Sequence, residues 1–418
     1  MKSIYALLFL GFSILSLNLQ AQTKKCASME IYQKRIVQDP SLQEKRDTEE
    51  IETQNWINSH PNTLLTRNII TIPVVVHVVY NTDEENISDE QIESQIITLN
   101  EDFRLLNADS LPDIHPFWQF TADSQIEFCL ASKDPNGNST NGITRTQTNI
   151  TEFTGDDDQI KFTSEGGIDN WNPTKYLNIW VCNLGSGLLG YATFPSDLAN
   201  FPDFDGVVIR HTAFGYVGTA TAPNDYGRTG THEVGHWLNL HHIWGDAECG
   251  NDLVSDTEPA FENNYQCPDF PYNANSSCGT GDAGEMYMNY MDYVDDACMV
   301  MFTAGQATRM RAALNGPRAG LLTSTACQSV GLDENFTSNS FEIYPNPSND
   351  KFTIDTHFDN KQAVSISLYN LLGEKICDLG KVKAYPFEIN VRDLPTGSYF
   401  MNFTSAENSV TKKVFISK

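Results

Sequence analysis

The sequence predicts an α+β fold for most of the chain, followed by a small all-β sandwich at its C-terminal end. A β-branched run at 69–80 and a helix-spaced histidine motif at 232–242 indicate a sheet combined with helices. Apolar residues that alternate with polar ones, in short runs separated by turn residues, indicate the sandwich at 340–418. A length of 418 residues is enough for two or three domains.

Residues 1–22 have the pattern of a secretory signal peptide. Lys2 is followed by an apolar stretch from Ile4 to Leu19 and by an acceptable cleavage site at Leu19-Gln20-Ala21. The stretch contains polar residues and is short for a membrane span, so cleavage is preferred over anchoring. We therefore expect a secreted chain without a transmembrane segment once the signal is removed.

The composition limits the partners and the redox state. A net charge of -27 argues against nucleic acid, because phosphates would be repelled, and against docking on an anionic membrane. Nine cysteines in an exported chain indicate disulfides, with at least one thiol left over. We interpret Cys129, Cys182 and Cys377 as reduced core residues. Four cysteines after the histidine motif can pair in three ways: Cys249, Cys267, Cys278 and Cys298.

The regular elements are predicted from local patterns. Residues 23–66 are polar and predict one or two short amphipathic helices with little core of their own. The run at 69–80 predicts a buried strand, and Ser88 predicts the N-cap of a helix that continues through Phe103. Further strands are predicted at 126–130, 177–182 and 207–210.

The segment from His232 to His242 predicts a catalytic metal site. His232 and His236 are four residues apart, so on a helix they project from one face and can share a tetrahedral ion. Glu233 lies beside the first ligand, where its carboxylate can act as base on a metal-bound water. His242 can complete the set only if the chain turns sharply, and Asn239 tolerates the left-handed conformation that such a turn requires.

The alternative is a chance motif whose histidines are ordinary surface or core residues. The third histidine at the right offset and the apolar helix face of Val234, Trp237 and Leu238 argue against chance. His241 cannot point the same way as its neighbour, and we interpret it as a surface or substrate-cleft residue.

This motif resembles the HExxHxxGxxH signature of the metzincin metallopeptidases, with Asn239 in place of the glycine. The methionine turn of the signature is matched by Asn289-Tyr290-Met291-Asp292-Tyr293. With the helix start Phe302-Thr303-Ala304-Gly305-Gln306, the chain closely resembles the pappalysin family of metzincins over about residues 68–315. The resemblance implies a metzincin-like catalytic domain at 67–318, with a twisted mixed sheet and a zinc-binding active-site helix.

The resemblance implies a zinc endopeptidase and assigns roles to single residues. Glu233 would be the general base. Tyr293 would donate a hydrogen bond to the oxyanion, the alternative being a buried packing tyrosine. Met291 would form an apolar floor beneath the metal. The zinc ligands would be the neutral imidazoles of His232, His236 and His242.

Recognition of substrate is predicted at two places. In metzincin-like folds an edge strand above the cleft pairs with an extended substrate, and residues 187–195 are our candidate, the alternative being an ordinary buried strand. Asp296, in the loop that shapes the primed-side pocket of the family, predicts cleavage on the amino side of Arg or Lys. The alternatives are a solvated loop aspartate, or Asp295 as the bearer of specificity. The resemblance also implies the disulfides Cys249–Cys278 and Cys267–Cys298.

The polar segment 23–66 is interpreted as a propeptide. A thiolate is a good fourth zinc ligand, so Cys26 predicts a cysteine switch that keeps a zymogen latent; the alternative is a disulfide to a leftover cysteine. The bond Thr66–Arg67 is the predicted maturation site and Lys45–Arg46 its rival.

Calcium is predicted in an acidic loop after the zinc motif. Hard oxygen ligands gather there, and family members bind calcium in the stretch 252–257. The loop also contains Asp246 and Glu248, and the alternative is a merely solvated acidic loop. The residues named as ligands are Asp252, Asp256 and Thr257.

Residues 319–339 are predicted to form a linker before the C-terminal domain at 340–418. The motifs YPNP, LYNLLGEKI, LPTGSYF and KKVFISK resemble, in the right order, the C-terminal sorting domain of type IX secretion. That resemblance implies the secretion machinery as a partner, the alternative being a substrate-binding sandwich. The whole sequence predicts a secreted zinc endopeptidase acting on proteins or peptides. The alternatives are a secreted binding or adhesion protein with an unused metal site and a zinc amidase acting on cell-wall material.

Overall fold

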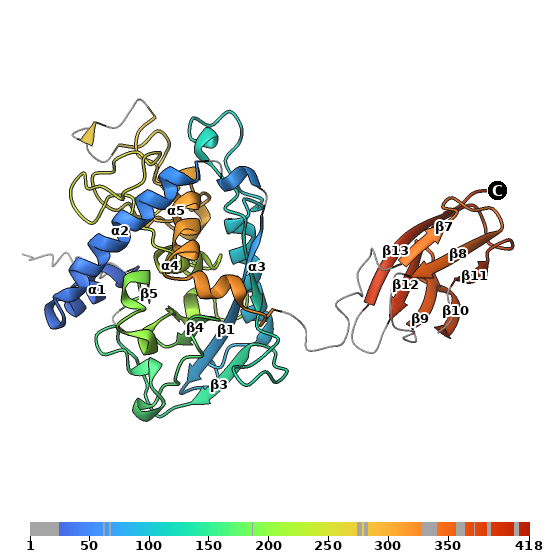
Figure 1. Cartoon of the computed structure of the whole chain (residues 1–418), viewed down its shortest axis with the longest axis horizontal. Helices are drawn as coiled ribbons and strands as arrows, with labels where there is room; N and C mark the ends of the chain where they lie inside the picture. Colours follow the sequence, from blue (N-terminus) through green and yellow to red (C-terminus); the bar gives the residue numbers. More distant parts are fainter. Residues whose placement is uncertain are drawn as a thin grey trace, which may run out of the picture. The chain divides into compact units, whose positions relative to one another are not determined.

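The computed structural model divides the chain into two compact units, Met1–Cys327 and Gln328–Lys418 (Figure 1). The predicted signal peptide and Arg67, in the predicted maturation bond, lie outside the described residues. The first unit continues through residues 319–327, which the sequence assigned to the linker. The described residues are 25–61, 63–66, 68–185, 187–273, 278–279, 283–327, 341–356, 364–371, 373–382, 386–404 and 409–418.

The first unit is built on a six-stranded mixed sheet with the strand order β2-β1-β4-β6-β5, and β3 also pairs with β1. All pairings are parallel except that of β5, which runs antiparallel to β6 at the edge of the sheet. The predicted strands at 69–80, 126–130, 177–182 and 207–210 are confirmed. The strands are β1 (Ile70–Tyr80), β2 (Ile126–Leu130), β3 (Ile143–Gln147), β4 (Leu177–Cys182), β5 (Gly190–Ala192) and β6 (Val207–Arg210).

Three helices complete the core of this unit. Ser88 caps α3 (Asp89–Phe103) by accepting a hydrogen bond from the Gln91 amide, as predicted. Helix α4 (Arg228–Trp237) is buried along its whole length and packs against α3 and β5. A capping box formed by Thr303 and Gln306 starts α5 (Ala304–Asn315).

The N-terminal segment forms two helices, α1 (Ser28–Gln38) and α2 (Ser41–Ser59), drawn in blue in Figure 1. Helix α2 packs against α5, and α1 contacts β5. Only Leu42, Glu49 and Thr53 are buried among the described residues of α2. The prediction of helices with little core of their own is therefore confirmed, but α2, with 19 residues, is longer than the short amphipathic helix that the sequence predicts. Both helices depend on the domain that they cover.

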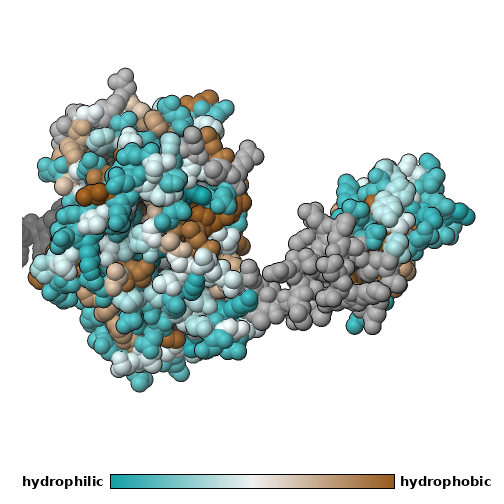
Figure 2. All heavy atoms as spheres, viewed as in Figure 1, coloured by the Kyte–Doolittle hydropathy of each residue, from teal (hydrophilic) through white to brown (hydrophobic). Residues whose placement is uncertain are grey.

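The C-terminal unit is a sandwich of two antiparallel sheets, β10-β9-β12-β13 and β11-β8-β7, around its own apolar core. Most residues on the face of this unit that Figure 2 shows are hydrophilic. Among the described residues of the chain, no helix has the length and apolar character that a membrane span needs. The strands are β7 (Phe341–Tyr344), β8 (Lys351–Thr356), β9 (Val364–Tyr369), β10 (Lys375–Val382), β11 (Phe387–Asn390), β12 (Gly397–Thr404) and β13 (Ser409–Ile416).

Three disulfides join parts of the first unit. Cys249 is bonded to Cys278, and Cys267 to Cys298, which are the pairs that the family resemblance implies. The interpretation of Cys129 as a reduced core residue is wrong, because it is bonded to Cys327 across 198 positions of sequence. That bond fastens the end of the first unit to β2. The thiols are Cys26, Cys182 and Cys377.

Candidate metal centre

The three predicted zinc ligands converge on one point. Helix α4 carries His232 and His236, and their Nε2 atoms lie 3.1 Å apart. The helix ends at Trp237, and Asn239 follows with a φ of 73°, the left-handed turn that the sequence predicts. This turn brings His242 back, with its Nε2 3.1 Å from that of His236.

Each imidazole is oriented by a hydrogen bond from its other ring nitrogen. His232 Nδ1 donates to the carbonyl of Tyr290 at 2.7 Å, and His236 Nδ1 donates to the carbonyl of Leu240 at 2.8 Å. His242 Nδ1 lies 2.6 Å from Asp246 Oδ1, so this carboxylate, which the sequence grouped with the calcium loop, serves the histidine instead. Burial lowers the pKa of His232 and His236, which favours the neutral form that binds a metal.

The methionine turn lies directly beneath the helix. Met291 is fully buried, and a Cβ on Gly235 would meet its Sδ at 2.5 Å. Glycine at this position therefore permits the close approach between helix and turn. Met291 supports the histidine-bearing helix from below, in line with the apolar floor that the resemblance implies.

Cys26 supplies a fourth donor. Its Sγ and one ring nitrogen from each of His232, His236 and His242 all lie within 4.8 Å of one another, and all four residues are buried. Three imidazole nitrogens and a sulfur are the donor set of a closed tetrahedral zinc site, and the spacing between the nitrogens suits one small ion. Within the described residues this is the single such cluster of histidine, cysteine and acidic side chains.

The carboxylate of Glu233 lies beside this cluster and is occupied by the N-terminal segment. Its Oε2 accepts hydrogen bonds from Ser28 Oγ at 2.9 Å and from Cys26 Sγ at 3.4 Å. Burial raises the pKa of Glu233 to about 8. Ser28 also accepts a hydrogen bond from the Ala192 amide at 2.8 Å, so it links the segment to both the carboxylate and the sheet edge. Sequence reasoning missed Ser28, although it follows Cys26 by only two positions.

Tyr293 reaches the same cluster from the methionine turn. Its ring packs near His242 and Trp244, with centroid distances of 5.0 and 4.8 Å. Its hydroxyl donates to the carbonyl oxygen of Cys26 at 3.4 Å. Burial raises the pKa of Tyr293 well above its usual value, so the hydroxyl keeps its proton. The side chain thus packs like a core tyrosine and also presents a donor to a peptide carbonyl.

The N-terminal segment is bound to the edge strand that the sequence proposed for substrate. Cys26 forms a parallel bridge with Gly190 of β5, and the Ala27 amide donates to the Gly190 carbonyl at 3.2 Å. The edge position predicted within 187–195 is confirmed, because β5 is the last strand of the sheet and its neighbour within the sheet is β6. A Cβ on Gly190 would meet Glu233 Cγ at 2.9 Å, so glycine lets this strand approach the carboxylate.

Lys25 fills a pocket beside the metal ligands. Its Nζ donates to the Val294 carbonyl at 2.8 Å and to Asp295 Oδ1 at 3.3 Å. A cavity of only about 10 Å³ remains beside Lys25, and Thr229 and Met299 are among the residues that line it. The sequence did not lead to a prediction for Lys25, although a basic residue directly before the cysteine is a feature that could have identified it.

Asp296 lines the same pocket without touching the ammonium group. Its Oδ2 accepts hydrogen bonds from the amides of Tyr226 at 3.0 Å and Arg228 at 3.1 Å. Burial raises the pKa of Asp296 to about 6. The solvated-loop alternative does not fit this buried carboxylate. Of the two neighbouring aspartates, Asp295 makes the direct contact, while Asp296 adds a nearby charge and holds the pocket wall.

His241 is covered by helix α2 and is only 9% exposed, so in this form of the chain it is not a surface residue. Arg46 Nη2 lies 3.1 Å from its Nδ1, and the Arg46 guanidinium also stacks on Tyr32 and Phe194. Arg309 binds Glu50 of α2 through its two terminal guanidinium nitrogens. The N-terminal helices are therefore held to the cleft by several charged contacts.

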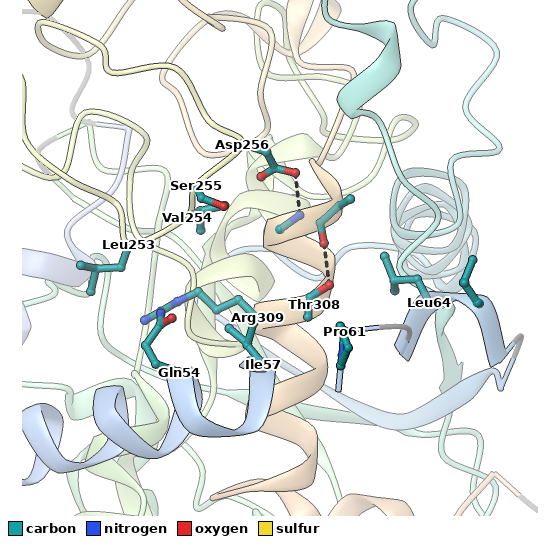
Figure 3. A pocket seen from close by; sticks show the side chains of 13 residues that line it. Gln54, Ile57, Pro61, Leu64, Leu253, Val254, Ser255, Asp256, Thr308 and Arg309 are labelled. Atoms are coloured by element: carbon teal, nitrogen blue, oxygen red, sulfur yellow. Dashed lines mark hydrogen bonds between the residues drawn. The ribbon is translucent and has the colours of Figure 1, made fainter. Parts of the chain in front are cut away.

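The predicted calcium ligands are occupied by protein donors. Asp252 accepts hydrogen bonds from Thr257 Oγ1 at 2.9 Å, and burial raises its pKa to about 6. Asp256 caps α5, accepting from Thr303 Oγ1 and from the Gly305 amide. The loop borders a cavity of about 500 Å³ between α2 and α5, and in Figure 3 the Asp256 carboxylate points toward α5.

Two family models match the chain. One is described as Pregnancy-associated plasma protein-A, peptidase M43, and matches residues 161–315. The other is described as Secretion system C-terminal sorting domain and matches residues 342–417. The two matches fall on the two structural units.

Comparison with individual proteins also finds metalloproteases. An extracellular metalloprotease of Arthroderma otae is 30% identical over 256 residues, covering 60% of this chain and 80% of the relative. Mature mirolysin of Tannerella forsythia, solved with a cleaved peptide, is 51% identical with a TM-score of 0.60, covering 61% of this chain and 96% of that one. A promirolysin mutant from the same organism is 44% identical with a TM-score of 0.62, covering 72% and 97%.

Proposed function

The chain belongs to the pappalysin family of metalloproteases, and on this premise we propose that it is a secreted zinc endopeptidase, made as a latent precursor, that cuts on the amino side of Arg or Lys. The observation that carries the proposal is the convergence of three imidazoles, a carboxylate and a tyrosine hydroxyl on one point of the cleft. The match of residues 342–417 to a sorting domain supports export through the type IX machinery to an extracellular site.

In the mature enzyme, Glu233 is the base and Tyr293 the donor to the oxyanion. Zinc, held by His232, His236 and His242, would polarise the scissile carbonyl and acidify a bound water. Glu233 takes a proton at its Oε2, the atom that Ser28 and Cys26 occupy in the precursor, and later delivers it to the leaving amine. The Tyr293 hydroxyl already donates to a peptide carbonyl, which supports its role toward the oxyanion.

Latency follows from three neighbouring residues of the precursor. The Cys26 thiolate would hold zinc together with the three histidines, in place of the catalytic water. Ser28 binds the base, and Lys25 fills the adjacent pocket. We propose that residues 23–66 are the propeptide and that removing them exposes all three positions. The rival maturation bond Lys45–Arg46 lies inside α2, which makes it the poorer site.

The specificity proposal rests on Lys25 as a stand-in for substrate. Its ammonium group contacts Asp295 and lies near the buried Asp296, so a basic substrate side chain can use the same contacts. If this pocket receives the residue after the cut, the pocket lies in the half of the cleft that binds the carboxyl side of the substrate. Lys25 precedes Cys26, so the propeptide crosses the cleft in the direction opposite to a substrate.

Calcium remains a further proposal for the loop at 252–257. The carboxylates of Asp252 and Asp256 are close to protein donors, so an ion there would have to replace some of these hydrogen bonds. Calcium-dependent protection of the mature enzyme against heat, lost in an Asp252→Asn variant, would support the site.

The test compares the mature enzyme with Glu233→Ala and with Glu93→Ala, a matched control whose glutamate is exposed on a helix. Each is incubated with a proteome-derived peptide library, cut sites are identified by mass spectrometry, and zinc content is measured. We expect cuts before Arg and Lys from the wild type and the control, and none from zinc-loaded Glu233→Ala. Equal cutting by all three would contradict the role of Glu233. Cuts without enrichment of basic residues would contradict the pocket assignment alone.

A further inference from the structure

A second basic side chain of the propeptide, Arg35 of α1, fills another pocket next to the edge strand. Its Nη1 donates to Asp197 Oδ2 and its Nη2 to Asp158 Oδ2, both at 2.7 Å. The guanidinium carbon lies 5.1 Å from the ring centroid of Phe204 and 6.0 Å from that of Phe201. Two carboxylates and two aromatic faces thus surround one cation, which is the environment that best suits a guanidinium group.

The two carboxylates, Asp158 and Asp197, differ in the contacts that remain once Arg35 is removed. Asp158 also binds Lys161 Nζ and the Tyr191 hydroxyl, each at 2.9 Å, so it retains a cation. Among the described residues, Asp197 forms an ion pair with Arg35 alone. Its side chain is 1% exposed, and its Oδ1 has no hydrogen-bond partner among the described residues even while Arg35 is bound. Burial raises the pKa of Asp197 in spite of the neighbouring guanidinium.

The cover over this pocket is the propeptide itself. Besides Arg35 from α1, the loop at 195–199 faces residues of α2, including Glu44 and Glu49. Lys34 also pairs with Asp156, in the loop that carries Asp158. Removal of α1 and α2 therefore opens the pocket to solvent and leaves it with one uncompensated carboxylate.

Its position follows from the direction of the propeptide. Lys25, Cys26 and Arg35 come in this order, with Cys26 at the metal and running parallel to β5. The loop with Asp197 follows the C-terminal end of β5, whereas Lys25 comes before the Cys26–Gly190 bridge and contacts Val294 and Asp295. If Lys25 marks the pocket for the residue after the cut, the Arg35 pocket lies on the side of the residues before it.

We propose that the mature enzyme uses the pocket formed by Asp158, Asp197, Phe201 and Phe204 to bind an arginine side chain that precedes the scissile bond. The inference rests on the proposed function and deepens it, since substrates would be basic on both sides of the cut. Arginine is favoured over lysine because its planar group can bridge the two carboxylates and stack on the rings. The pocket is a binding site and takes no part in the chemical step.

The test uses mature enzyme and peptides with a fixed basic residue after the cut. A single Arg is moved through the positions two to eight residues before the cut, and each peptide has a twin with citrulline, which has nearly the same shape without the charge. At one or two neighbouring positions we expect kcat/KM to be about tenfold higher for Arg than for citrulline. In Asp197→Asn this ratio should fall toward one, and in the control Asp203→Asn, an exposed carboxylate of the same loop, it should persist.

Two outcomes would overturn the inference. One is a ratio near one at every position in the wild type, a result that needs no variant and is independent of whether Asp197→Asn folds. The other is a high ratio that Asp197→Asn retains. In both cases cleavage before the fixed basic residue would leave the proposed function intact, whereas loss of all cleavage by the wild type would contradict the proposed function itself.

Discussion

The packing role and the catalytic role of Tyr293 can be separated by removing its hydroxyl oxygen. Phenylalanine keeps the ring contacts with His242 and Trp244 and removes the hydroxyl that donates to a peptide carbonyl. We expect Tyr293→Phe to lower kcat by about 10²–10³ with little change in KM or melting temperature. Steady-state kinetics of the mature enzyme test this. Tyr265→Phe, a neighbouring tyrosine, is the control, and full activity of Tyr293→Phe would favour a packing role.

The ligands and the turn between them were predictable because they depend on local spacing. His232, His236 and Asn239 fall within one helix and its end, where the helical repeat fixes directions. Asp295 and Asp296 could not be told apart in the same way. They are adjacent in an irregular loop, and the amides that bind Asp296 come from residues 226 and 228, far away in sequence.

At the scale of elements, the propeptide holds the precursor latent through contacts rather than through a core of its own. We expect Cys26→Ala to shorten the half-time of maturation by about tenfold or more, because a ligand to the metal is lost. Ser28→Ala should have a smaller effect in the same direction, since it frees only the carboxylate of Glu233. Gel analysis over time measures both, with Ser41→Ala, exposed on α2, as control. Unchanged latency of Cys26→Ala would contradict the switch.

Helix α2 carries a buried acid that makes its docking depend on pH. Burial raises the pKa of Glu49 to about 7 although Arg318, Arg309 and Arg46 are nearby, and Asp197 adds to the shift. The unfolded chain releases this proton near pH 4.5, so the free energy of unfolding should fall as pH rises from about 4.5 to 7. The full effect is at most about 3 kcal/mol.

Glu49→Gln removes this titration. In an inactive Glu233→Ala precursor, we expect Glu49→Gln to raise the melting temperature at pH 8 and to leave it nearly unchanged at pH 4. Scanning calorimetry at both values tests the sign. Glu52→Gln, an exposed glutamate of the same helix, should show no such difference, and an equal gain for Glu49→Gln at pH 4 and pH 8 would rule out the buried acid as the cause.

The strands and helices were more predictable than the loops that join them. Residues 70–80 form a nearly fully buried strand, as their β-branched run indicates. The acidic stretch at 252–257 and the family resemblance predicted a calcium site, which stays a prediction. The sequence did not show that Asp256 caps the start of α5, which lies almost fifty positions later. Such use of a carboxylate depends on tertiary contacts, and the sequence alone does not reveal it.

At the scale of the whole molecule, the two units have separate apolar cores, and the first ends at a disulfide. We expect a chain that stops after Cys327 to fold, mature and cleave peptides with unchanged kcat/KM, but to be absent from the culture medium of its native host. Immunoblots of medium and cells, with Lys375→Gln in the full-length chain as control, test this. Secretion of the shortened chain at the normal level would contradict a sorting role.

The organisation into units was predictable because composition changes along the chain, but the boundary was not. Cys129 and Cys327 are 198 positions apart, and no local pattern pairs them. Residues 319–327 belong to the first unit because residues 319–323 pack against α5 and β1, and this bond fastens the end of the segment to β2. The same limit applies to Lys25 and Arg35, whose pockets are assembled from distant loops.

The reversed path of the propeptide through the cleft has a kinetic consequence. If Lys25 occupies the pocket for the residue after the cut, the backbone carbonyl and amide at Cys26 are exchanged relative to those of a substrate, so the bond at Cys26 is not presented for cleavage within the same molecule. We therefore expect freed enzyme to cut other precursor molecules, which would make activation a bimolecular chain process. Its time course should show a lag that shortens as precursor concentration rises and that disappears when a trace of mature enzyme is added as seed.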